Sequence, residues 1–113
     1  MHEMALCESI LQILEEQARA QAYNRVRAVR LEVGELAQVE LEALRFGFEV
    51  VTRGTLAEGA RLDIIDVQGE AWCSRCRRSV RARERFDCCS ECGGFGLQIT
   101  RGEEFRVKEL EVE

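Results

Sequence analysis

Apolar residues recur at intervals of three and four along the first part of the chain. Met4, Cys7, Leu11, Leu14 and Ala18 follow this spacing, while polar residues, mostly glutamates and glutamines, fill the opposite face. Such a period places the apolar side chains on one stripe of an α-helix. The pattern therefore predicts an amphipathic helix that begins almost at the first residue. It also makes Cys7 a small core residue rather than a metal ligand.

The spacing of apolar residues changes several times further along the chain. Alternation of apolar and polar residues is typical of a half-buried strand, and a return to spacings of three and four indicates a second helix. Glycines mark the ends of these segments, and proline is absent. The predicted elements are a helix over residues 41–53 and strands over residues 29–34, 61–67, 95–99 and 105–112.

Four of the six cysteines form two Cys-x-x-Cys pairs, Cys73 with Cys76 and Cys89 with Cys92. Each pair can direct two thiolates at one ion, and four thiolates complete the tetrahedral shell of Zn(II) without an open position for water or substrate. The spacing therefore predicts a structural zinc site. Cys88 is an alternative ligand beside Cys89, but its use would lengthen the second spacer to three residues, so Cys89 is the expected ligand.

Two disulfides are the alternative interpretation of the same four cysteines. The N-terminal region shows no secretory hydrophobic segment, and the composition is typical of a cytosolic protein. Thiols stay reduced in the cytosol, where clustered cysteines usually bind metal. The zinc interpretation and a cytoplasmic location are therefore favoured.

Together the predicted elements indicate an α+β fold. Two helices pack on a small β-sheet in the order α-β-α-β-β, and a zinc-ribbon-like module with four cysteines is inserted before the last strand. We expect residues 1–70 plus 102–113 to form the α/β domain. Residues 71–101 are expected to form the zinc-binding domain, with both of its ends joined to strands.

The charge of the chain is uneven. The 113 residues carry a formal net charge of −5, which opposes a general role in nucleic-acid binding. Six arginines between Trp72 and Cys92 nevertheless make the zinc module basic. A zinc ribbon that binds nucleic acid or protein is therefore the alternative function, although Phe86 is the only stacking aromatic in the arginine run. No apolar segment approaches the roughly 20 residues of a membrane span.

An enzyme is disfavoured by the residues that remain available for catalysis. The chain has one histidine, His2, at its end, and four of its cysteines are assigned to zinc. It also lacks a phosphate-binding loop of the GxxxxGK[ST] type.

The N-terminus carries a candidate site for a second metal. A bulky residue at position 2 is expected to leave Met1 in place. The amine of Met1, the amide nitrogen of His2 and the His2 imidazole then form consecutive chelate rings, and a planar set of nitrogens selects Ni(II) or Cu(II). The amide of Glu3 could supply a fourth nitrogen, with its carboxylate orienting the imidazole. The alternative is a solvated histidine near a frayed terminus.

A set of short motifs spans the whole chain, and the combination of an N-terminal Met-His-Glu with two Cys-x-x-Cys pairs is its most specific part. The motifs lie at residues 1–3, 6–10, 31–36, 42–46, 52–60, 71–73, 89–94 and 107–112. In these segments the chain resembles the HypA/HybF family of hydrogenase nickel-incorporation proteins. Cys88 departs from the family, which more often has proline there, and this admits alternative zinc ligation.

The resemblance implies a nickel metallochaperone that helps to load Ni(II) into the large-subunit precursor of NiFe-hydrogenase. Its implied partners are that precursor and a HypB-type GTPase, and some members of the family also serve urease maturation. It also implies that an acidic residue at Glu40 can lie close to the nickel end. Carried over residue by residue, the nickel ligands are Met1, His2 and Glu3, and the zinc ligands are Cys73, Cys76, Cys89 and Cys92.

Overall fold

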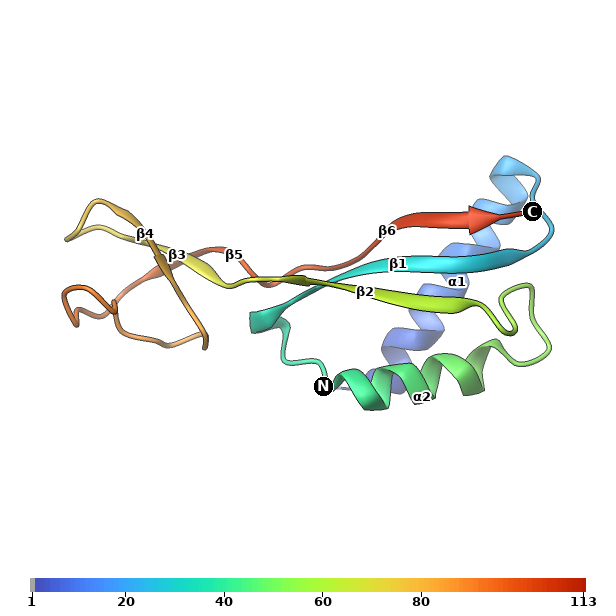
Figure 1. Cartoon of the computed structure of the whole chain (residues 1–113), viewed down its shortest axis with the longest axis horizontal. Helices are drawn as coiled ribbons and strands as arrows, with labels where there is room; N and C mark the ends of the chain where they lie inside the picture. Colours follow the sequence, from blue (N-terminus) through green and yellow to red (C-terminus); the bar gives the residue numbers. More distant parts are fainter. Residues whose placement is uncertain (1) are drawn as a thin grey trace. The chain divides into compact units, whose positions relative to one another are not determined.

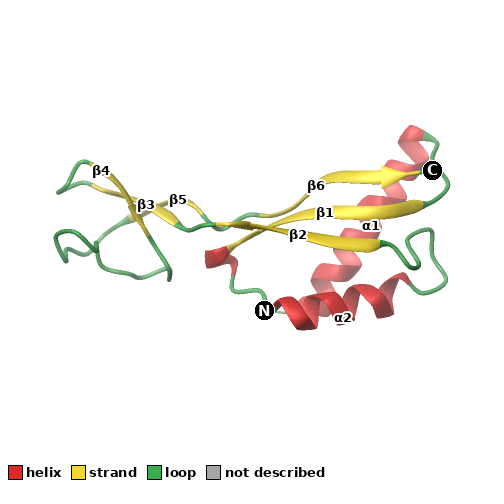
Figure 2. Ribbon diagram, in the orientation of Figure 1, coloured by secondary structure: helices red, strands yellow, loops and turns green. Residues whose placement is uncertain are grey.

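The computed structural model describes residues 2–113, so Met1, one of the predicted nickel ligands, lies outside the described residues. Figures 1 and 2 show the arrangement of the helices and strands. No helix among residues 2–113 is long and apolar enough to cross a membrane. In chain order the elements are α1 (Glu3–Gln21), β1 (Val26–Gly34), a 3-10 helix η1 (Glu35–Ala37), α2 (Leu41–Thr52), β2 (Arg61–Val67), β3 (Glu70–Cys73), β4 (Arg78–Arg81), β5 (Gln98–Arg101) and β6 (Phe105–Val112).

The strands form two three-stranded sheets, with the orders β2-β1-β6 and β4-β3-β5. The helices and the strands of the first sheet follow one another as α1, β1, α2, β2 and β6, which confirms the predicted α-β-α-β-β order and the α+β class. The chain divides into two compact units. We call residues 2–31, 39–64 and 107–113 the helix-bearing unit, and residues 32–38 and 65–106 the cysteine-bearing unit. The predicted boundaries between the α/β domain and the zinc-binding domain, at residues 70–71 and 101–102, stay a prediction.

The two helices form much of the core of the helix-bearing unit. Cys7 and Leu14 on α1 and Leu44 on α2 are fully buried, and α1 packs against α2. The Cys7 thiol donates a hydrogen bond to the Leu44 carbonyl at 3.2 Å, and the Tyr23 hydroxyl donates to the Leu14 carbonyl at 2.7 Å. Burial raises the pKa of Cys7 to about 11, so it remains a thiol at neutral pH. Cys7 is therefore a core residue, as predicted, whereas Met4 at the edge of the stripe is 43% exposed.

The second sheet differs most from the prediction. Strands β3 and β4 pair antiparallel with Ala71 opposite Val80, and neither strand was predicted. In β4, Val80 is the only apolar residue of the four, so no alternating pattern marks the strand. The predicted strand over residues 95–99 is wrong in its bounds, since β5 begins at Gln98. Gly96 has a φ of 82°, a left-handed conformation that interrupts an extended strand, and Phe95 is 86% exposed.

Two glycines allow close approach of backbone segments in the cysteine-bearing unit. A Cβ on Gly69 would lie 2.0 Å from the carbonyl oxygen of Ala82, and one on Gly102 would lie 2.6 Å from the Cα of Gly69. The Gly69 carbonyl accepts a hydrogen bond from the Ala82 amide at 3.0 Å, and the Gly69 amide donates to the Glu35 carboxylate at 2.9 Å. The segments are thus held at a separation that only glycine permits.

We expect Gly69→Ala to lower the free energy of unfolding of the metal-loaded protein by about 3 kcal/mol, because the added methyl group overlaps backbone atoms that cannot move independently. Gly96→Ala is the control. A Cβ there would meet nothing within 4 Å, so only the left-handed φ opposes the change, at about 1 kcal/mol. Urea unfolding measures both variants. Equal stabilities would contradict the close-approach explanation.

Candidate metal centres

The four cysteines predicted to bind zinc come together in the cysteine-bearing unit. Their sulfur atoms all lie within 4.8 Å of one another, and the Cys73–Cys92 and Cys76–Cys89 sulfur pairs are each 3.8 Å apart. Tetrahedral zinc with Zn–S bonds of about 2.3 Å places its sulfurs about 3.8 Å apart. All six cysteines of the chain are free thiols, so the two-disulfide interpretation is wrong. The sulfur spacing therefore fits one tetrahedral ion.

The two Cys-x-x-Cys turns share a backbone hydrogen bond and a left-handed residue at the same positions. The Cys73 carbonyl accepts a hydrogen bond from the Arg77 amide at 2.8 Å, and the Cys89 carbonyl accepts one from the Gly93 amide at 2.7 Å. The residue after the second cysteine is left-handed in both turns, with φ values of 54° at Arg77 and 70° at Gly93. The second turn uses glycine at this position, whereas the first carries the steric cost of a side chain.

Replacing the left-handed arginine should stabilise the first turn. We expect Arg77→Gly to raise the free energy of unfolding of the metal-loaded protein by about 0.5 kcal/mol, since relief of strain exceeds the added flexibility of the unfolded chain. Thermal unfolding measures the change. Ser74→Gly, in the same turn but without a positive φ, should lower the stability instead. A destabilised Arg77→Gly protein would contradict this interpretation.

Burial and hydrogen bonds distinguish the four sulfurs. Cys73 and Cys89 are 4% and 2% exposed, whereas Cys92 is exposed. The Cys76 amide lies 3.5 Å from the Cys73 sulfur, and the Glu91 amide lies 3.4 Å from the Cys89 sulfur. The backbone N–H groups of Cys92 and Glu91 lower the pKa of Cys89 to about 7. The donors to Cys89 favour its thiolate, the form that binds metal.

Cys88 lies outside the sulfur cluster. Its side chain is exposed, while that of Cys89 is almost fully buried among the other ligands. The structure therefore brings Cys89, and not the alternative ligand Cys88, together with the other three cysteines.

The predicted nickel end lies at the start of α1. His2 is exposed and precedes the helix, and its carbonyl accepts the hydrogen bond of the Leu6 amide at 3.1 Å. The amides of His2 and Glu3 come before the first donor of the helical ladder, so formation of α1 does not use them. A nitrogen donor at either position therefore leaves the helix intact.

The Glu3 carboxylate is held by the loop before α2. Its Oε2 accepts a hydrogen bond from the Glu40 amide at 3.2 Å, and this bond lowers the pKa of Glu3. The Glu40 carboxylate in turn accepts a hydrogen bond from the Glu42 amide at 3.1 Å and caps α2. The structure thus brings Glu40 beside Glu3, one of the predicted nickel ligands. The sequence contained no signal for the backbone donor to Glu3, because it joins residues 37 positions apart.

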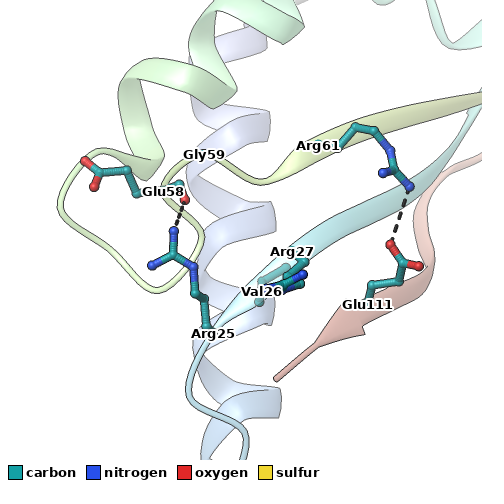
Figure 3. A pocket seen from close by; sticks show the side chains of 7 residues that line it. All are labelled: Arg25, Val26, Arg27, Glu58, Gly59, Arg61 and Glu111. Carbon is teal, nitrogen blue, oxygen red and sulfur yellow. Dashed lines mark hydrogen bonds and ion pairs between the residues drawn. The ribbon is translucent and has the colours of Figure 1, made fainter.

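The helix-bearing unit also contains an open hollow of about 410 Å³, shown in Figure 3. Three arginines line it. Arg25 donates to the Glu58 carbonyl at 3.1 Å, and Arg61 pairs with Glu111 at 3.4 Å (Figure 3). Arg27 pairs with Glu113. Because each guanidinium already has an acceptor, this hollow is a network of ion pairs and hydrogen bonds rather than a candidate anion site.

The α+β fold and the four-thiolate centre define a metal-binding protein whose tetrahedral site has no open position. Over residues 1–112 the chain matches the family described as "Hydrogenase/urease nickel incorporation, metallochaperone, hypA". The chain belongs to this family of nickel-incorporation metallochaperones, and the class of function expected from the sequence is confirmed.

Relatives and solved structures agree with this assignment. The chain is 61% identical to "Hydrogenase maturation factor HypA" of Azotobacter chroococcum mcd 1 and 60% identical to that of Azotobacter vinelandii, in both cases over 113 residues and the full length of both proteins. Its fold is also similar to a solved structure described as "Solution structure of the Ni metallochaperone HypA from Helicobacter pylori", with a TM-score of 0.72 and 25% sequence identity. That match covers 99% of this chain and 97% of the other, so the whole fold is shared.

Proposed function

We propose that this protein carries Ni(II) at its N-terminus and delivers it to the large-subunit precursor of NiFe-hydrogenase. The observation that carries the proposal is the full-length match to the nickel-incorporation family. The protein acts in the cytoplasm as a carrier and not as an enzyme, and a HypB-type GTPase is its partner in nickel transfer. Delivery to urease maturation proteins is a second use of the same cargo site.

The proposed nickel ligands are the amine of Met1, the amide nitrogen and imidazole of His2, and Glu3. The exposure of His2 supports this assignment, because an exchangeable ion needs a route for incoming ligands. The His2 amide must lose its proton to bind, and the positive end of the α1 dipole favours the resulting negative charge. The Glu40 amide keeps Glu3 ionised, which adds further negative charge beside the ion.

The proposed occupant of the four-cysteine centre is a structural Zn(II) ion bound by Cys73, Cys76, Cys89 and Cys92. Sulfur separations of 3.8 Å and the N–H···S contacts to two of the sulfurs support a tetrahedral thiolate site. Zinc has no redox chemistry, and four protein ligands leave it no position for substrate. Nickel and zinc are thereby kept at sites of different softness, nitrogen for one and sulfur for the other.

Nickel titration of the zinc-loaded, full-length protein tests this function. Isothermal titration calorimetry should give one Ni(II) per chain for protein with a free Met1 amine. A short glycine extension before Met1 retains every side chain but displaces the amine from the chelate, and we expect it to weaken nickel binding at least tenfold, or about 1.4 kcal/mol. Equal affinities for the two proteins would contradict the proposed nickel end.

A further inference from the structure

The four-cysteine centre concentrates negative charge at one exposed point. Four thiolates and one divalent ion together carry about −2. Cys92 is the most exposed of the four ligands, because Cys73 and Cys89 are buried and Cys76 is partly buried. Backbone N–H groups donate to the Cys73 and Cys89 sulfurs. Cys92 is therefore the ligand through which water, a chelator or a competing metal-binding group would first reach the ion.

Arg75 lies next to this exposed ligand. A Cβ on Gly94 would be 3.1 Å from both Cδ and Nη1 of Arg75 and 3.3 Å from the Cys92 sulfur, so the guanidinium and the sulfur share the space above Gly94. Arg75 belongs to the first Cys-x-x-Cys turn, whereas Gly94 and Cys92 belong to the second. Its side chain thus reaches from one turn to the other, across the edge of the centre.

The charge of Arg75 is available to the metal centre. Three other arginines of the run are paired with carboxylates, Arg78 with Glu91 at 2.9 Å, Arg81 with Glu35 at 2.8 Å and Arg85 with Glu103. Among residues 2–113, Arg75 forms no such ion pair, and neither do Arg77 and Arg83, but only Arg75 lies beside the Cys92 sulfur at Gly94. Its guanidinium therefore lies near the Cys92 sulfur, beside Gly94, without a competing carboxylate.

We propose that Arg75 is a positioning residue that retains the ion in the four-cysteine centre. Its positive charge attracts the negatively charged metal centre at its exposed edge, keeps the two turns together and slows the first step of zinc loss. This proposal rests on the proposed zinc occupancy. It explains why an exposed cysteine can serve as a durable ligand, and it assigns a role to one member of the arginine run.

The rate of zinc loss to excess EDTA from the zinc-loaded, full-length protein tests this role. We expect Arg75→Gln to lose zinc about fivefold faster than the unaltered protein, the size of one exposed charge pair. Arg75→Lys should recover part of the difference, because it restores the charge without the fork of the guanidinium. Arg77→Gln is the matched control, since it removes the same charge from the same turn, and its rate should change less than about twofold.

Salt separates the electrostatic role from a packing role. Raising the ionic strength should speed zinc loss from the unaltered protein and bring its rate toward that of Arg75→Gln, whose own rate should change little. Equal rates for Arg75→Gln and Arg77→Gln would overturn the proposal, and so would a salt-independent difference. If Arg75→Gln fails to fold, the Arg75→Lys rate decides in its place. An unaltered protein that binds no zinc would overturn the proposed zinc site itself, a different result from zinc binding without an Arg75 effect.

Discussion

His2→Ala is expected to lower the affinity of the zinc-loaded protein for Ni(II) by about 100-fold, or about 2.7 kcal/mol. The substitution removes the imidazole and with it one complete chelate ring, leaving an amine and an amide that hold the ion from one side only. Calorimetric titration measures the change. His2 is exposed and caps α1 without a side-chain hydrogen bond, so the fold and its stability should be unaffected.

Glu8→Ala is the matched control for this result. It removes an exposed carboxylate from α1 without removing a proposed ligand, and its affinity should stay within about twofold of the unaltered protein. Nickel affinity should also fall steeply as the pH is lowered, because protons compete for the amide nitrogen and the imidazole. A similar loss in Glu8→Ala, or binding that is independent of pH, would contradict chelation by the N-terminus.

Cys76→Ala is expected to reduce the zinc content from one ion per chain to near zero and to unfold the cysteine-bearing unit. The ligands are also part of its core, since buried Cys73 and Cys89 pack with Val80 in one small cluster. Structural zinc in small peptides supplies roughly 10–16 kcal/mol of apparent binding energy, more than these few apolar contacts replace. Metal analysis and the dispersion of amide NMR signals measure the two effects.

Cys88→Ala provides the comparison for Cys76→Ala. Cys88 is exposed and outside the sulfur cluster, so its removal should leave the zinc content and the NMR spectrum unchanged. Loss of zinc in Cys88→Ala would mean that the second turn uses a different cysteine from the one assigned.

The sequence predicted those parts of the fold whose signal is local and repeated. Both helices and β2 lie where the spacing of apolar residues placed them. The two Cys-x-x-Cys pairs likewise predicted the sulfur cluster, because each turn fixes two ligands within four residues. The assignment of zinc to this cluster and of nickel to the N-terminus stays a prediction for the experiments above.

Other features depend on packing and could not be predicted in this way. Strand β4 has one buried apolar residue, Val80, so it contains no alternating pattern, and its pairing with β3 follows from the turn between them. The contact between the Glu3 carboxylate and the Glu40 amide depends on how α1 and α2 pack. The position of Arg75 beside Cys92 requires both turns to be folded around one centre.

X-ray absorption at the nickel edge, on zinc-loaded protein carrying one equivalent of Ni(II), tests the N-terminal site most directly. The proposed ligands predict a planar, four-coordinate ion with only nitrogen and oxygen neighbours, and an imidazole contribution that disappears in His2→Ala. Sulfur in the first coordination shell, or a spectrum that His2→Ala leaves unchanged, would contradict nickel binding by the N-terminus.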